Sequence, residues 1–304
     1  MYPLLIYMRK FLVSIGIVLI PTIWGVAQIK KQFSIEPSSE FERVEMKFMT
    51  KSGMCYIKPS QHDAPLSIYS NQDFDDYEHT FKKSIVDRTC FVDLSLTDKN
   101  SDDLSKSISS RMFNSSDKGK HKMWKVYLTD NTPYSLDLNY GMGEAFIDLS
   151  GLSIEKLKVN SGNADVNIGF MSGLGNQVLM DTFFVKVDLG SVNVQKMNLS
   201  KSKLVMADIG FGNLYLDYND VPEQASEIKA SVGAGNLVVS VPKKDVPVIV
   251  KINDSMLCRI RLSRSFTEIE DNTFVNPAYT EDADNLLSFD VDVSLGSIVF
   301  KEVD

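Results

Sequence analysis

The stretch LVMADIGFGNLYL, from Leu204 to Leu216, decides the fold. Apolar and polar residues alternate on both sides of Gly210 and Gly212, a pattern typical of two β-strands joined by a tight turn. Related units recur through the last two-thirds of the chain. The copies are Leu136–Ile147, Leu157–Ile168, Val185–Val194, Leu204–Leu216, Ile228–Val239 and Phe289–Phe300.

Every copy carries glycine at the expected turn. The turn glycines are Gly141, Gly143, Gly162, Gly190, Gly210, Gly212, Gly233, Gly235 and Gly296. Counted by one key glycine per copy, the first five copies are 21, 28, 20 and 23 residues apart. Such a period is typical of a stacked array, because one unit alone cannot bury its apolar face. We expect an all-β, single-stranded parallel β-solenoid whose glycines supply the positive φ of sharp turns.

Two polar columns follow when the copies are aligned on their key glycines. The first contains Asn139, Asn160, Asp188, Asp208, Ser231 and Ser294, and the second contains Glu144, Asp165, Asn193, Asn213 and Asn236. Stacked amides bond from layer to layer, so ladders that hold the register are the structural interpretation. The alternative is a Ca²⁺ site, since Asp188 and Asp208 would repel each other as neighbours. No other cofactor is expected.

Residues 1–27 have the pattern of a signal peptide. Arg9 and Lys10 precede the apolar stretch Phe11–Ile20, and small residues lead to a predicted cleavage site after Ala27. An uncleaved membrane anchor is the alternative, although the stretch is short for a span of about 20 residues. The first cysteine is Cys55, so a lipid-modified N-terminus is not expected. We therefore predict secretion across the inner membrane to the periplasm or the cell surface, with no membrane span after cleavage.

The rest of the chain divides into two continuous parts. Residues 28–123 are expected to form N-terminal β-coils, interrupted by a Ser/Lys-rich loop at 98–122, and residues 124–304 the repeat solenoid. After cleavage the chain holds 30 Lys and Arg against 40 Asp and Glu, a net charge of −10. No basic stripe is present, so nucleic acid is not an expected partner.

The chain also resembles a known bacterial family. The residues that carry the resemblance are Trp124–Leu128, Pro133, Leu136–Glu144, Ile147–Leu152, Ser231–Pro242 and Asp292–Phe300. They resemble the "toast-rack" proteins, a group that overlaps LiaF-type cell-envelope stress regulators and adhesin-head domains. The resemblance covers roughly residues 41–304 and implies a β-solenoid without catalytic residues. Unlike LiaF-type members, this chain lacks several N-terminal membrane spans.

Residues that could carry chemistry are scattered. His62, His79 and His121 do not share metal-ligand spacing. The three cysteines, Cys55, Cys90 and Cys258, are an odd number for a disulfide framework, and buried free thiols are the expected state. An enzyme acting on polysaccharides would need clustered carboxylates. The candidates Asp137, Asp148, Asp165, Asp188 and Asp208 instead recur with the repeat.

Aromatic residues near successive turns are better candidates for binding. Tyr140, Phe211, Tyr215 and Tyr218 are predicted either to line a contact surface for sugar or protein, or to pack at the corners of the coils. The sequence thus predicts an exported, non-catalytic interaction protein of the cell envelope, adhesin-like, whose partner is an envelope protein or a glycan. The alternatives are a LiaF-like regulatory partner in envelope stress and a carbohydrate-active enzyme.

Overall fold

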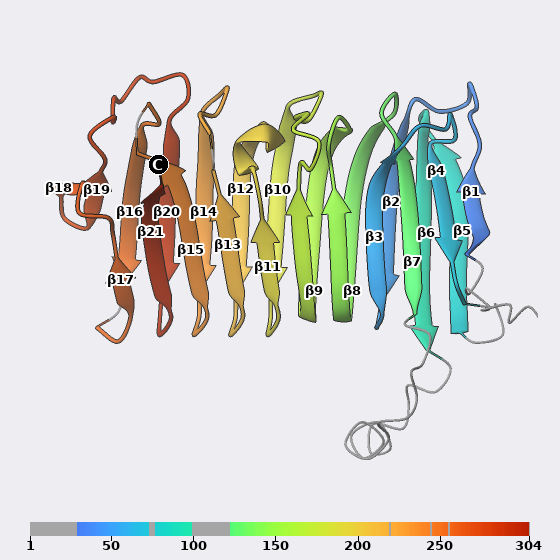
Figure 1. The fold of residues 1–304 in the computed structure, drawn as a ribbon, viewed down its shortest axis with the longest axis horizontal. Coiled ribbons are helices and arrows are strands. Elements are labelled where there is room, and N and C mark those ends of the chain that lie inside the picture. Colours follow the sequence, from blue (N-terminus) through green and yellow to red (C-terminus); the bar gives the residue numbers. More distant parts are fainter. Residues whose placement is uncertain are drawn as a thin grey trace, which may run out of the picture.

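The protein is a rod of stacked β-coils (Figure 1). The computed structural model describes residues 29–72, 77–98, 122–218, 220–243, 245–254 and 256–303. The predicted all-β parallel solenoid is confirmed. The predicted signal peptide and the predicted loop at 98–122 lie outside the described residues, apart from the ends of the loop. Within the described ranges, no helix has the length and hydropathy needed to cross a membrane.

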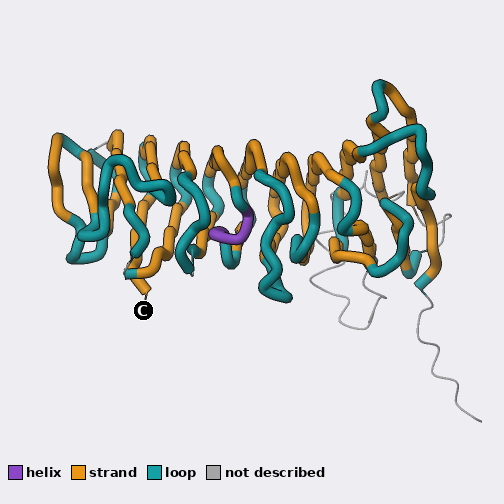
Figure 2. Tube along the Cα trace, turned by 90° about the horizontal axis from the view of Figure 1, so that it is seen from above, coloured by secondary structure: helices purple, strands orange, loops and turns teal. Residues whose placement is uncertain are grey.

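Each coil places one strand in each of two layers, seen as successive flattened loops in Figure 2. The first layer contains β2 (Arg43–Thr50), β6 (Thr89–Asp98), β10 (Met180–Val187), β12 (Ser202–Ile209), β14 (Ser226–Val232), β16 (Val248–Asp254) and β20 (Leu287–Val293). The second contains β3 (Met54–Ser60), β7 (Met123–Thr129), β11 (Ser191–Val194), β13 (Asn213–Asp217), β15 (Asn236–Pro242), β17 (Arg259–Arg261) and β21 (Ser297–Val303). The long strands β8 (Pro133–Asp148) and β9 (Ser153–Gly169) bend at the turn and contribute to both layers.

The two edges of the rod differ. The glycine turns join first-layer to second-layer strands along one edge, the lower one in Figure 1. We call this the glycine edge. The opposite edge carries the longer returns to the next coil, including the short 3₁₀ helix η1 (Met197–Ser200).

At both ends the coils stack out of chain order. Strands β2 and β3 lie between the coil of β6 and β7 on one side and β8 on the other. The last coil, β20 and β21, lies between the β14–β15 coil and the β16–β17 coil. The C-terminal coil is therefore internal to the stack.

Antiparallel strands close the two ends of the rod. At the N-terminal end β1 (Lys30–Ile35) pairs with β4 (Leu66–Ser70), and β5 (Tyr77–Val86) pairs with β6. The rings of Phe33 and Phe81 stack there, with centroids 4.7 Å apart. At the other end β19 (Thr273–Val275) and β18 (Thr267–Glu270) add an antiparallel hairpin to β16. These elements cover edges at which parallel stacking would otherwise continue.

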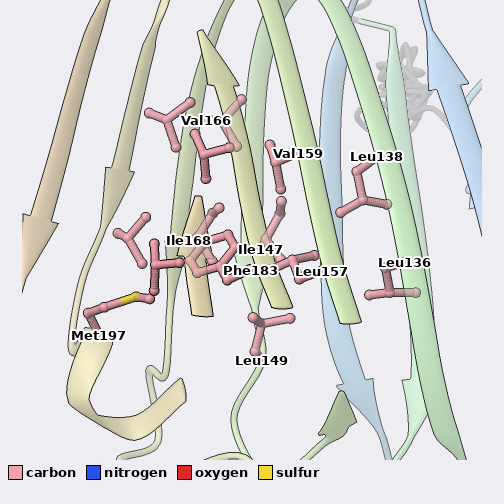
Figure 3. Close-up of a cluster of buried hydrophobic side chains, with 14 of the residues drawn as sticks. Leu136, Leu138, Ile147, Leu149, Leu157, Val159, Val166, Ile168, Phe183 and Met197 are labelled. Atoms are coloured by element: carbon pink, nitrogen blue, oxygen red, sulfur yellow. The ribbon is translucent and has the colours of Figure 1, made fainter. Parts of the chain in front are cut away.

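A continuous apolar core runs between the layers. Alternation turns every second side chain inward, as with Val44, Met46 and Phe48 on β2, which are essentially fully buried. In Figure 3, Leu138 and Val159 from the first layer lie across from Ile147 and Val166 of the second, with no charged side chain among the sticks. The outer faces are polar and carry the candidate sites.

Candidate functional site

The predicted turn glycines all lie on the glycine edge, but most serve a different purpose from the one predicted. Of the nine, only Gly143 has a positive φ, +110°. Close backbone contact requires five of the others: a β-carbon on Gly296 would stand 2.2 Å from the carbonyl oxygen of Gly235, and one on Gly190 would stand 2.1 Å from that of Ala164. The same holds for Gly141, Gly212 and Gly235. At Gly162, Gly210 and Gly233 the nearest carbonyl oxygen is 3.1, 3.1 and 3.0 Å away, so a β-carbon there needs only a small shift of the neighbouring coil. The prediction that positive φ explains the glycines is therefore wrong for eight of them. At the five glycines in close contact, the coils approach so closely that a side chain does not fit.

The first polar column needs a correction of register. Lys186, not Asp188, lies between Asn160 and Asp208, and Asp292, not Ser294, pairs with Ser231. Asp188 is a turn residue that aligns with Gly210, because its carbonyl accepts the N–H of Phe211. The first two members of this column still form an amide ladder, because Asn160 Nδ2 donates to Asn139 Oδ1 at 2.6 Å.

The second column is a ladder as well, and one of its members is corrected. Ser191, not Asn193, pairs with Asn213. Asn236 Nδ2 donates to Asn213 Oδ1 at 2.7 Å, and the Ser297 hydroxyl donates to Asn236 Oδ1. These side chains hold neighbouring coils in register.

The corrected register removes the basis of the Ca²⁺ hypothesis. Asp188 and Asp208 are not cross-strand neighbours, and the Lys186 ammonium lies 3.6 Å from an Asp188 oxygen. No group of three or more His, Cys, Asp or Glu side chains suited to a metal ion occurs in the described part of the chain.

Two of the four candidate aromatics are buried, so for them packing, and not a contact surface, is the alternative that holds. Tyr140 points inward beside Phe48, and its hydroxyl lies 3.9 Å from the Cys55 sulfur. Tyr218 is 2% exposed and packs edge-on against Phe289. Strand alternation turns both rings into the core.

The other two predicted aromatics reach the surface. Phe211 occupies the middle of a glycine turn and is 72% exposed, and Tyr215 points outward from β13 at 40%.

The cysteines are free thiols, as expected. Cys55 and Cys90 are buried in the core, whereas Cys258 is partly exposed. Burial raises the pKa of the Cys55 thiol to about 12, so this group stays protonated and unreactive at neutral pH.

The five carboxylates considered for an enzyme do not form one cluster. Asp137 and Asp208 lie on the first layer, Asp165 on the second, and Asp188 in a turn. Asp148 is committed to structure, since its Oδ1 accepts hydrogen bonds from Ser150 and from the Met171 N–H.

The outer face of the first layer is hollowed by a groove of about 660 Å³. It crosses β5, β6, β2, β8, β9 and β10, and outward side chains of neighbouring strands form two rows in it. One row is Lys82, Asp93, Lys47, Asp137, Lys158 and Phe184; the other is Ser84, Phe91, Glu45, Ser135, Lys156 and Thr182. We call this the lysine groove.

The charges of the lysine groove are only partly neutralised. Lys158 forms an ion pair with Asp137 at 3.2 Å. Lys47, Lys82 and Lys156 form no ion pair with any residue that the structure describes. The groove holds four lysines against three acids in a chain of net charge −8, and Phe91 and Phe184 supply its apolar walls.

Of the residues that form the two rows of the lysine groove, only Asp137 was singled out from the sequence, as one of the carboxylates considered for an enzyme. Alternation identifies which residues point outward, but the rows exist only because β2 and β6 pair with each other and β2 with β8. Residues 47, 93 and 137 are far apart in the chain, and no local signal connects them.

Comparisons with solved structures give remote matches. A proposed cell adhesion protein from Clostridium sporogenes is 14% identical with a TM-score of 0.42, covering 91% of this chain and 100% of its own. A proposed adhesin from Bacteroides fragilis is 14% identical with a TM-score of 0.34, covering 90% and 97%. A third, from Parabacteroides merdae, is 11% identical with a TM-score of 0.28, covering 90% and 95%. At these scores the matches carry no information on function.

No curated protein matches this chain. The family model described as the N-terminal domain of toast_rack, DUF2154, matches residues 30–190, which is more than half of the chain. That span begins with β1 and ends in the turn after β10, and it includes the strands beneath the lysine groove. The protein therefore belongs to the toast-rack family.

Proposed function

We propose that this protein is an exported, non-catalytic rod of the cell envelope that binds an anionic polysaccharide in its lysine groove. The single observation that carries the proposal is the groove itself. It is open to solvent, and it runs across the strands, along the stack of coils, from β5 to β10. A ligand that lies in it must be extended.

The spacing of the lysines favours a polymer with regularly placed acids. Lys82 on β5, Lys47 on β2 and Lys158 on β9 share one row, and successive lysines are two strand spacings apart, with one strand between them. Strands lie about 4.8 Å apart, so the ammonium groups recur about every 10 Å. A polysaccharide with a carboxylate on every second sugar presents charges in this manner.

The remaining features of the groove suit a sugar chain. Ser135 and Thr182 offer hydroxyl groups. The Phe184 ring ends the first row and the Phe91 ring stands next to Ser84 near the other end of the groove, where both rings can pack against sugar faces. An adhesin-like role, in which the rod joins the cell to a polymer in the periplasm or outside the cell, follows from such binding. No proton transfer or covalent step is required.

Titration with hyaluronan oligosaccharides, which carry one carboxylate per disaccharide, tests the proposal. We expect saturable binding at low salt that weakens as ionic strength rises, and no binding of neutral dextran. Lys47→Gln lowers the affinity about fivefold, the upper range for one exposed ion pair. Lys229→Gln is the matched control, since Lys229 lies in the same row on β14, outside the groove. Absence of binding at low salt, or an equal loss with Lys229→Gln, overturns the proposal.

A further inference from the structure

A second hollow lies on the opposite face of the rod. It has a volume of about 430 Å³ and lies on the outer side of the second layer, over β9, β11 and β13. Its lining includes Asp165, Asn167, Ser191, Asn193 and Tyr215. We call it the amide hollow.

Short side chains between bulky ones create this hollow. Along one column of the layer, Tyr56, Phe146, Asn167, Asn193 and Tyr215 succeed one another in register. The two asparagines stand between aromatic rings on both sides. From the strand of Phe146 to that of Tyr215 the column spans about 14 Å, three strand spacings.

The two amides differ from all the laddered asparagines described above. Asn167 and Asn193 are direct cross-strand neighbours, as Asn213 and Asn236 are. Asn213 and Asn236 bond to each other at 2.7 Å, whereas neither Asn167 nor Asn193 forms a side-chain hydrogen bond with any described residue. Two adjacent amides thus present four N–H donors and two carbonyl acceptors to the hollow.

Of the aromatic groups on the two sides, Phe146 is held in place by a second ring. Phe146 stacks on Tyr56, with ring centroids 5.3 Å apart and planes 15° from parallel. Tyr215 is 40% exposed on the other side of the asparagines. Both rings present apolar faces, and the Tyr215 hydroxyl adds a polar tip. An aromatic side chain has few rotatable bonds, so it loses little conformational entropy when a ligand binds.

We propose that the amide hollow is a binding site for a neutral glycan. Aromatic rings that pack against sugar faces, together with amides that both donate to and accept from hydroxyl groups, match the alternating apolar and polar surface of a sugar. The carboxylate of Asp165 lines the hollow and Glu144 is its cross-strand neighbour, so an anionic ligand is disfavoured. This site does not depend on the lysine groove, which lies on the other layer.

Calorimetric titration of the full chain with cellohexaose, maltohexaose, mannohexaose and chitohexaose tests the proposal. We expect saturable binding of at least one of them, unaffected by salt. Tyr215→Ala and Asn193→Ala each weaken it about tenfold, while Phe211→Ala, which removes a more exposed aromatic ring on the glycine edge, leaves it unchanged. All three variants keep the thermal stability of the parent, because the changed side chains are outside the core.

Three results overturn the inference. Either no neutral hexasaccharide binds, or the Tyr215→Ala and Asn193→Ala variants bind it as tightly as the parent does, or Phe211→Ala lowers the affinity as much as Tyr215→Ala does. Hyaluronan titration of the same variants separates this site from the lysine groove. If the Tyr215→Ala variant still binds hyaluronan but no longer binds the neutral hexasaccharide, the two sites are independent. If hyaluronan alone binds to the parent, the amide hollow is not a glycan site and the proposed function stands.

Discussion

The carbonyl oxygen of Gly212 lies 2.2 Å from the point where a β-carbon on Gly235 would stand. Real β-carbons do not approach an oxygen so closely, and the oxygen belongs to the backbone of the preceding coil. Gly235→Ala therefore pushes two coils apart, and we expect it to lower the free energy of unfolding by about 1–3 kcal/mol.

Gly233→Ala is the graded control for this change. At that position the nearest atom, the Gly210 carbonyl oxygen, is 3.0 Å away, so the neighbour has less far to move. Urea unfolding of both variants should show a clearly larger loss for Gly235→Ala. Equal losses would mean that the glycines are required for backbone conformation instead of close contact.

Asn236→Ala removes two rungs of the second ladder, the bond to Asn213 and the bond from Ser297. Each such bond contributes about 0.5–1.5 kcal/mol, so we expect a loss of about 1–3 kcal/mol in thermal or urea unfolding. Asn167→Ala is the matched control, because its amide has no described hydrogen-bond partner and the change should stay within about 0.5 kcal/mol. A loss in the control as large as that in Asn236→Ala would refute the role of the ladder.

Asp217→Asn should stabilise the protein at pH 7. Partial burial on β13 raises the pKa of the Asp217 carboxyl, so the folded state favours its protonated form. Stability from this group is present below the unfolded pKa of about 3.9 and is lost as pH rises through the raised folded value. Asparagine does not ionise. Thermal unfolding at pH 7 and pH 3 should show a gain for Asp217→Asn only at pH 7, and a variant that is less stable at pH 7 contradicts this account.

A chain that ends at Asp284 lacks β20 and β21, the internal coil near the C-terminal end. It loses Phe289 and Phe300 from the core and leaves β14, β15 and β16 without a partner on one side. We expect destabilisation on the order of 5 kcal/mol or more, measured by thermal unfolding. Ile269→Ser on the exposed end strand β18 serves as control and should change stability by less than about 0.5 kcal/mol. Unchanged stability after truncation would show that the β16–β17 coil closes directly onto β14 and β15.

Local pattern was enough to predict the coils and several details. The alternation around Gly210 and Gly212 predicted β12 and β13 correctly. The β5–β6 hairpin is equally local, since the Asp87–Arg88 turn joins Val86 to Thr89. Both residues of that turn have positive φ, as a two-residue hairpin requires. These features depend on residues adjacent in the chain.

The register of the columns was predicted only in part. Gly190 and Gly296 occupy the second glycine position of their turns, whereas Gly141, Gly162, Gly210 and Gly233 occupy the first. Counting from the wrong glycine shifts a strand by two residues. Such a shift leaves the inward and outward faces unchanged, so alternation gives no warning of it.

By itself, then, the amino-acid sequence determined the coil, its glycine turns and which side chains face the core, because these follow from periods of two residues and from local turn chemistry. Only the tertiary structure decided which coil stacks on which. The parallel pairing of β2 with β6 and of β14 with β20 joins distant segments through backbone hydrogen bonds that any alternating strand can form. Both candidate sites, the lysine groove and the amide hollow, are rows of side chains across such pairings, and for that reason neither is visible along the chain.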